Sequence, residues 1–142
     1  MAALRRLGKT DLELSAIGLG CWQFSQARGL IGSYWPALPQ PTVDAIVAGA
    51  IAGGITWFDT AEAYGEGRSE EALARALDAA GKKPGEVRVA TKWNPFLRSA
   101  RSLGGTIDER LRRLAPWPID LYQVHQPISF SSVEDEMDAM AA

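Results

Sequence analysis

Cysteine and histidine are almost absent from this sequence, and it has no long apolar run. Cys21 is the single cysteine and His125 the single histidine, which excludes an internal disulfide framework and a cysteine-rich metal site, so we expect no bound metal. No apolar stretch approaches the ~18 residues that span a bilayer. Asp11 and Glu13 interrupt what would be the apolar part of a signal peptide. These absences favour a soluble cytoplasmic protein that does not enter a membrane.

An excess of either charge is also lacking. Lys and Arg together number 15 and Asp and Glu 17, for a formal net charge of −2, so nothing in the charge balance favours binding to a nucleic acid. Hydrophobic residues make up 46% and charged residues 23% of the 142 positions. This composition excludes wholesale disorder and predicts a single domain large enough to have its own core.

The sequence does contain a repeated pattern of a short apolar strand followed by an amphipathic helix. Residues 1–15 are the exception: two short segments flank the turn-forming residues 8–11 (GKTD) and predict a small leading hairpin. Strands this apolar in series with helices favour a parallel sheet covered by helices. From residue 16 onward, the predicted strands are residues 16–20, 55–58, 87–91 and 119–124.

Local signals predict helix ends and buried faces. Ser69 is the expected N-cap of the second long helix, and Glu70 follows in the first turn, where the helix dipole favours a negative charge. In the third long helix, Ile107, Leu111 and Leu114 have the spacing of one buried face. We therefore expect these apolar residues to face the sheet.

Two architectures fit this pattern, an open doubly wound sheet and part of a closed barrel. An open dinucleotide-binding sheet would have G-x-G-x-x-G after its first strand, but Gln23 stands at the last glycine position after Gly18 and Gly20. The final helical pattern continues to the last residue, which favours an interrupted barrel. The expected fold is α/β, of the (β/α)8 TIM-barrel type, in one domain over residues 1–142: the leading hairpin and four βα units over residues 16–142.

Polar residues follow three neighbouring predicted strands. Asp59, Lys92 and His125 come at the C-terminal ends of the second, third and fourth strands, and Tyr64 lies on the loop just after Asp59. Barrel enzymes have their active sites on this face. Adjacent strands lie ~4.8 Å apart, so the four side chains can share one pocket.

Each of these residues also has a purely structural interpretation. Asp59 could satisfy backbone donors of the following loop, and Lys92 could turn out to solvent. Tyr64 could be a half-buried loop aromatic, and His125 a hydrogen-bonded core histidine. Four such residues at one predicted rim nevertheless favour a shared site over four coincidences.

A tyrosine, a lysine and an aspartate in one pocket suit proton donation. A phenol titrates near pH ~10, too high for efficient donation at neutrality. A nearby ammonium would lower the pKa of Tyr64, and an aspartate would keep Lys92 charged and in place. His125 would orient a carbonyl oxygen by donating a hydrogen bond. Such a site suits adding a proton to oxygen while a hydride from a nicotinamide reaches carbon.

Three stretches of the chain resemble the aldo-keto reductases. Residues 58–70 (FDTAEAYGEGRSE) are similar to that family's F-D-T-A-x-x-Y-G-x-G-x-S-E motif, and residues 90–92 (ATK) and 119–127 (IDLYQVHQP) are similar to two further motifs. The pattern from Arg5 to Trp22 is similar too. The resemblance therefore covers essentially the whole chain.

The resemblance implies a (β/α)8 barrel, NADPH as the hydride donor and the reduction of a small-molecule aldehyde or ketone to an alcohol. By match to the motif, Tyr64 would donate the proton, and Asp59 and Lys92 would be the pair that tunes it. His125 would orient the carbonyl. The resemblance also implies a set of cofactor-binding residues beside the nicotinamide: Cys21, Trp22 and Asp59.

The chain is short for such a barrel, which needs about 250 residues. We therefore expect the N-terminal half of a reductase, incomplete by itself, with most cofactor contacts of the family lying in the other half. Two other interpretations remain open. One is a non-catalytic truncated barrel that forms a homo-oligomer through exposed sheet edges, and the other is a redox-sensing accessory subunit that keeps the same four residues.

Overall fold

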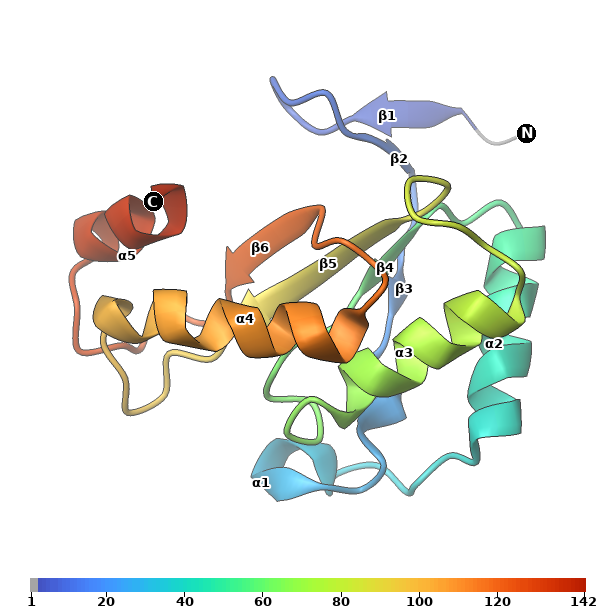
Figure 1. Cartoon of the computed structure of the whole chain (residues 1–142), viewed down its shortest axis with the longest axis horizontal. Helices are drawn as coiled ribbons and strands as arrows, with labels where there is room; N and C mark the ends of the chain where they lie inside the picture. The colour runs from blue at the N-terminus through green and yellow to red at the C-terminus, as the bar shows by residue number, and fades with distance from the viewer. Residues whose placement is uncertain (1–2) are drawn as a thin grey trace.

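The computed structural model describes residues 3–142 as a hairpin and a four-stranded sheet with helices packed on it (Figure 1). The strands are β1 (Leu4–Arg6), β2 (Glu13–Ser15), β3 (Leu19–Gly20), β4 (Trp57–Asp59), β5 (Arg88–Trp93) and β6 (Leu121–Val124). The helices are α1 (Gly29–Gly32), α2 (Gln40–Ala52), α3 (Arg68–Ala79), α4 (Leu103–Leu114) and α5 (Val133–Ala141), and 3-10 helices span Trp22–Ser25 and Ala100–Ser102.

Strands β3 to β6 form one parallel sheet, in the order in which they occur in the chain. The long helices α2, α3 and α4 connect successive strands, and α5 follows β6. Consecutive parallel neighbours joined by helices are the arrangement of βα units, so the predicted parallel α/β sheet is confirmed. Within residues 3–142, β3 and β6 each pair on one side only. Self-association through these edges stays a prediction.

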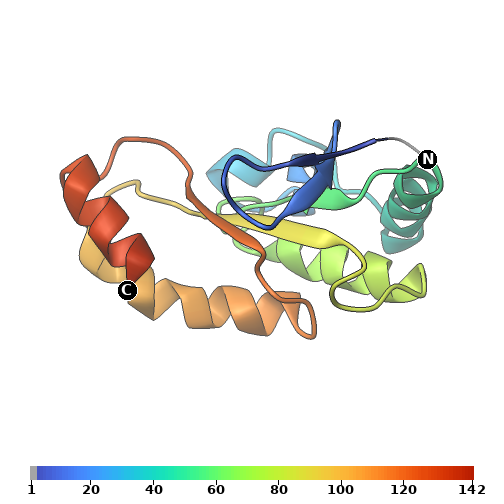
Figure 2. The ribbon, with the colours of Figure 1, turned by 90° about the horizontal axis from the view of Figure 1, so that it is seen from above.

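The hairpin of β1 and β2 is attached at the N-terminal end of the sheet. The Ser15 N–H donates to the Thr56 hydroxyl at 2.9 Å, and the Trp57 indole N–H donates to the Ser15 carbonyl at 3.1 Å. In Figure 2 the hairpin lies on one side of the sheet, and α3 and α4 lie along the other. The hairpin therefore leaves the C-terminal strand ends uncovered.

The main core lies between the sheet and the helices α2 and α3. Apolar side chains at helical spacing on these two helices meet the outward-facing side chains of the strands, which explains why both segments are helical here. The fully buried core side chains include Val43, Val47, Phe58, Leu73, Leu77, Val89 and Leu114.

Among residues 3–142, no helix has the length and apolar character needed to cross a membrane.

The first strand of the sheet is shorter than predicted. Only the two residues of β3 pair with β4. Just before them, Gly18 packs against the indole of Trp57, and a Cβ on Gly18 would lie 2.3 Å from that ring. A larger residue could not approach so closely. The third strand is longer than predicted, since β5 continues through Lys92 to Trp93.

Helix α3 begins before the predicted position. Gly67 is its N-cap, with a φ of 87°, and Ser69 lies inside the helix, fully buried. The Ser69 hydroxyl donates to the Cys21 carbonyl at 2.6 Å and accepts from the Thr60 hydroxyl at 2.8 Å. The prediction of Ser69 as N-cap is wrong because tertiary partners occupy its hydroxyl. These bonds connect α3 to the loops at two strand ends.

The buried face of α4 also differs from the predicted one. Leu114 is buried as expected, but Leu111 is 44% exposed and Arg110 is only 4% exposed. Helical spacing of the leucines favoured the opposite arrangement. Arg110 is buried because two glutamates lie beneath this face of the helix, as described below.

Candidate active site

Three polar side chains lie on one face of the sheet, near the C-terminal ends of adjacent strands. Asp59 is the last residue of β4, and Lys92 and Gln123 lie inside β5 and β6. Alternate residues of a strand share a face, and Lys92 pairs in register with Gln123. The sequence analysis placed Lys92 just after its strand, but Lys92 belongs to β5. Its long side chain reaches Asp59.

The ammonium of Lys92 is held by two oxygens. Nζ lies 2.6 Å from Asp59 Oδ2 and donates to the Thr60 carbonyl at 2.8 Å. The other carboxylate oxygen of Asp59 accepts from Gln123 Nε2 at 3.2 Å. Burial of a lysine is costly unless the charge is paired. This pairing excludes the interpretation in which Lys92 turns to solvent.

Tyr64 lies against both His125 and Lys92. Its hydroxyl is 3.5 Å from His125 Nε2, and the two rings meet edge to face with centroids 5.3 Å apart. Lys92 Nζ lies 5.1 Å from the centre of the Tyr64 ring, which is within the range of a cation–π contact. The structure thus brings together the four residues that the sequence analysis placed in one pocket: Asp59, Tyr64, Lys92 and His125.

The Tyr64 loop, residues 60–67, has an unusual backbone. Gly65, Glu66 and Gly67 are successive left-handed residues, with φ of 65°, 56° and 87°. A Cβ on Gly65 would lie 2.0 Å from the carbonyl oxygen of Ser25. Only glycine fits at this contact. The Tyr64 loop is therefore packed directly on the 3-10 helix that follows β3.

The surroundings of Tyr64 raise the pKa of its phenol. Burial is the largest cause, and the negative charge of Asp59 adds to it. The predicted net lowering of this pKa is therefore wrong for this structure, because burial and the charge of Asp59 both act against the phenolate. Tyr64 remains a protonated phenol at neutral pH, which is the form that donates a proton.

His125 is held toward its neutral form. Burial is the first cause that lowers the pKa of its imidazole, and the positive charge of Lys92 is the second. A neutral imidazole donates through one ring nitrogen and accepts through the other. His125 can therefore hydrogen-bond both a phenol and a carbonyl group.

The two residues after β3 differ in access to this site. The Trp22 ring stacks on Tyr64 with centroids 6.1 Å apart. Cys21 is fully buried, and burial raises the pKa of its thiol. Its backbone N–H donates to the Asp59 carbonyl at 2.8 Å. Trp22 thus borders the site, whereas the Cys21 side chain is a core residue and its backbone supports Asp59.

Three side chains at this site were missed by the sequence analysis. Gln123 shares a strand face with Lys92 and bonds Asp59, and its place two residues before His125 could have identified it. Tyr34 and Trp35 pack on Trp22, the first stacked at 5.5 Å and the second edge-on at 5.6 Å. Their one signal was the adjacency of two aromatic residues in a loop.

A buried charge cluster lies apart from this site, between the sheet, the Tyr64 loop and α4. Glu62, 6% exposed, lies 2.7 Å from Arg98 and 2.8 Å from Arg110. Glu70, with no exposure, accepts from the Thr91 hydroxyl at 2.6 Å. Its second oxygen lies 3.1 Å from Arg110 Nε in a close contact that is not aligned for a hydrogen bond. Two carboxylates therefore share one buried guanidinium.

Glu70 makes the stability of the protein depend on pH. Burial raises the pKa of its carboxyl from 4.5 to about 7, against the opposing effects of Arg110 and Thr91. The folded state therefore holds this proton more tightly than the unfolded state, and the unfolding free energy falls as pH rises between these values. We expect wild type to lose on the order of 2–3 kcal/mol relative to Glu70→Gln between about pH 5 and about pH 8.

Urea unfolding of both proteins at the two pH values measures this difference. Glutamine keeps the acceptor for Thr91 and removes the titrating group. Parallel stability curves for the two proteins would contradict the assignment of this pH dependence to Glu70.

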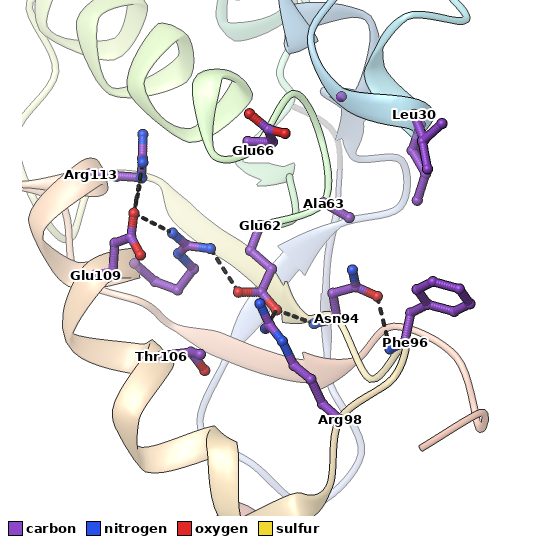
Figure 3. A pocket seen from close by; sticks show the side chains of 13 residues that line it. Leu30, Glu62, Ala63, Glu66, Asn94, Phe96, Arg98, Thr106, Glu109 and Arg113 are labelled. Carbon is purple, nitrogen blue, oxygen red and sulfur yellow. Dashed lines mark hydrogen bonds and ion pairs between the residues drawn. The ribbon is translucent and has the colours of Figure 1, made fainter. Parts of the chain in front are cut away.

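A hollow of about 540 Å³ lies beside the charge cluster, lined in part by Leu30, Glu66 and Phe96 (Figure 3). The hollow is not lined by any of the four candidate site residues, Asp59, Tyr64, Lys92 and His125. The three arginines that line it are each paired with a glutamate. Among residues 3–142, no three side chains of the metal-ligating types are grouped to hold an ion.

Comparison with known sequences gives a family match over most of the chain. Residues 16–142 match the Aldo/keto reductase family. The aldo-keto reductase YhdN of Bacillus subtilis is 34% identical over 142 residues, which covers 94% of this chain and 41% of YhdN. The chain thus spans less than half the length of this relative.

Solved structures agree with the sequence match. The thermostable aldo-keto reductase Tm1743, solved with the inhibitor epalrestat, has a TM-score of 0.78 at 27% identity, over 98% of this chain and 48% of that one. An aldo-keto reductase from Klebsiella pneumoniae, solved with NADPH, has a TM-score of 0.70 at 25% identity, over 91% of this chain and 41% of that one. The predicted fold, part of a (β/α)8 barrel, is confirmed.

Proposed function

Because this chain belongs to the aldo/keto reductase family of oxidoreductases, we propose that it carries the catalytic residues of an NADPH-dependent reductase that converts a small-molecule aldehyde or ketone to an alcohol in the cytoplasm. One observation carries the proposal. The Tyr64 hydroxyl lies 3.5 Å from His125, while Lys92, held 2.6 Å from Asp59, lies over the same ring.

Each of the four side chains has a defined part in this proposal. The Tyr64 hydroxyl gives its proton to the carbonyl oxygen of the substrate. His125 donates a hydrogen bond to the same oxygen and orients it. The positive charge of Lys92 stabilises the phenolate that remains, and Asp59 keeps that charge in place.

The residues present fit the nicotinamide end of the cofactor. NADPH, when bound, supplies a hydride to the carbonyl carbon. Trp22 offers a flat aromatic face beside Tyr64, and the Asp59 side chain, 27% exposed, offers a carboxylate acceptor at the same strand ends. We assign these two residues, with the backbone of Cys21 between β3 and Trp22, to the nicotinamide end.

The chain corresponds to part of the length of its relatives. The chain covers 41% of its Bacillus subtilis relative and 48% of the thermostable structural relative. We propose that residues 1–142 are the N-terminal half of one barrel domain, with a leading segment over residues 1–15, of which 1–2 lie outside the described residues, and four βα units over residues 16–142. Turnover then requires the remaining units.

Replacing Lys92 by methionine tests this function. Methionine keeps an apolar stem but lacks the charge that stabilises a phenolate, so we expect turnover to fall about 10²-fold or more. The assay follows the loss of reduced-nicotinamide absorbance with an aromatic aldehyde. It uses the chain alone and the chain complemented with the remaining barrel units of the Bacillus subtilis relative.

Arg88→Met is the matched control for this test. Arg88 also lies in β5 and pairs with an aspartate, Asp120, at 3.1 Å, but it lies at the opposite end of the strand from Lys92. Its replacement should leave turnover within about twofold of the parent. A complemented parent protein without turnover, or a Lys92→Met variant with unchanged turnover, would refute the proposed function.

A further inference from the structure

We infer that Glu62 is a positioning residue, which holds the Tyr64 loop so that the phenol stays beside His125 and Lys92. The inference rests on the proposed function, since it concerns the same reaction. Glu62 is not assigned a contact with the substrate or the cofactor. It acts through Tyr64, which lies two residues further along the loop.

Glu62 connects the Tyr64 loop to three other parts of the chain. Its backbone N–H donates to the Lys92 carbonyl at 3.2 Å, in β5. Its carboxylate accepts from the Asn94 backbone N–H, just after β5, and from Arg98 at 2.7 Å, in the loop before α4. It also accepts from Arg110 at 2.8 Å, in α4. Figure 3 shows the carboxylate of Glu62 turned toward Arg98 and Asn94.

The strength of these bonds follows from their burial. The Glu62 side chain is 6% exposed and Arg110 is 4% exposed. Hydrogen bonds between ionised groups are shorter and stronger than neutral ones, and they gain further where water is excluded. One carboxylate with three donors on different segments therefore fixes the loop in several directions at once.

The backbone of the loop transmits this position to Tyr64. The Tyr64 N–H donates to the Ala61 carbonyl at 3.1 Å, which closes a tight turn around Glu62. The Tyr64 carbonyl accepts from the Ser69 N–H at 3.2 Å, in the first turn of α3. A displacement of Glu62 must therefore move Tyr64, and a shift of about 1 Å at a reacting group can lower the rate by about 10²-fold.

Glu71 provides a matched comparison, because it makes the same kind of contact without being part of the loop. It bridges α3 to α4 through Arg113 at 2.6 Å and also pairs with Arg68 at 3.0 Å. Its replacement removes one interhelical ion pair and one pair within α3, and it leaves the contacts of Glu62 in place. An effect of Glu62→Gln that Glu71→Gln does not reproduce is therefore specific to the loop.

The single histidine of the chain gives a direct readout that needs no turnover. His125 lies edge to face with the Tyr64 ring at 5.3 Å, so the ring current of Tyr64 shifts the imidazole proton resonances in an NMR spectrum. Tyr64→Leu removes that ring and sets the scale. We expect Glu62→Gln to move the His125 resonances a large part of the way toward their position in Tyr64→Leu, while Glu71→Gln leaves them in place.

Turnover of the complemented protein gives the second readout. We expect Glu62→Gln to lower kcat about tenfold with KM for the carbonyl compound within about twofold. If Glu62→Gln fails to fold, Arg98→Gln, which removes a half-exposed partner of Glu62, should shift the His125 resonances in the same direction by a smaller amount.

The inference is overturned if the His125 resonances of Glu62→Gln, or of Arg98→Gln in its place, coincide with those of the parent. It is also overturned if Glu71→Gln moves them as far. These results are separate from the proposed function. If Tyr64→Phe leaves turnover intact, the function fails, while the NMR comparison still decides whether Glu62 positions the ring.

Discussion

Tyr64→Phe is expected to lower turnover about 10²- to 10⁴-fold, the range in which a positioned general acid contributes. Phenylalanine keeps the ring that stacks on Trp22 and meets His125 edge to face, so the variant removes a proton donor and little else. Binding of NADPH to the complemented protein, measured by fluorescence titration, should change by less than about twofold. Single-turnover kinetics with an aromatic aldehyde measures the loss.

Tyr34→Phe is the control for this variant. Tyr34 is a 73% exposed tyrosine that, like Tyr64, stacks on Trp22. Its hydroxyl has no part in the proposed proton transfer, so its loss should leave turnover within about twofold. A Tyr64→Phe variant that matches Tyr34→Phe in rate would rule out Tyr64 as the proton donor.

Arg110→Met is expected to destabilise the fold by about 3–5 kcal/mol. Arg110 is the shared partner of Glu62 and Glu70, with atoms 2.8 Å and 3.1 Å away. Methionine fills much of the same space but leaves the buried carboxylates of Glu62 and Glu70 without the positive charge of the guanidinium. Urea unfolding near neutral pH measures the change, which should shrink toward low pH because Glu70 is then protonated.

Arg113→Met is the control for Arg110→Met, because it removes the same charge from a more exposed position on the same helix. Arg113 lies in α4, three residues after Arg110. It pairs with Glu71 at 2.6 Å and with Glu109 at 2.7 Å, and its side chain is 24% exposed. Methionine keeps the stem that packs on Gly67, and water can solvate the remaining carboxylates, so we expect a loss of about 1 kcal/mol or less. Equal losses for the two variants would show that burial of Arg110 adds nothing.

The order of strands and helices was predictable from the sequence because it depends on repeated local signals. Apolar strands followed by segments with helical spacing recur along the chain, and parallel strands joined by helices place polar residues at one end. The approach of Asp59, Tyr64, Lys92 and His125 follows from that topology. The three motifs that resemble the aldo-keto reductases, residues 58–70, 90–92 and 119–127, gave the same grouping independently.

The details that failed depend on tertiary partners that no local pattern encodes. Ser69 has the sequence of an N-cap, yet its hydroxyl bonds Cys21 and Thr60. Arg110 has the sequence of a surface residue, yet two glutamates from other segments draw it inward. The pKa of Tyr64 rises because burial dominates and the charge of Asp59 adds to it, and burial of a loop residue could not be read from its neighbours in sequence.

The three left-handed residues after Tyr64 carry a cost that the loop itself does not recover. Glycine adopts this conformation freely, but Glu66 does so at an expense of about 1–2 kcal/mol. Strain of this kind persists only where the surroundings impose it, and it concentrates at working sites. With Tyr64 as the proposed proton donor, the strained backbone lowers the stability of the folded chain while it fixes the place of the phenol, the kind of exchange between stability and activity expected at an active site.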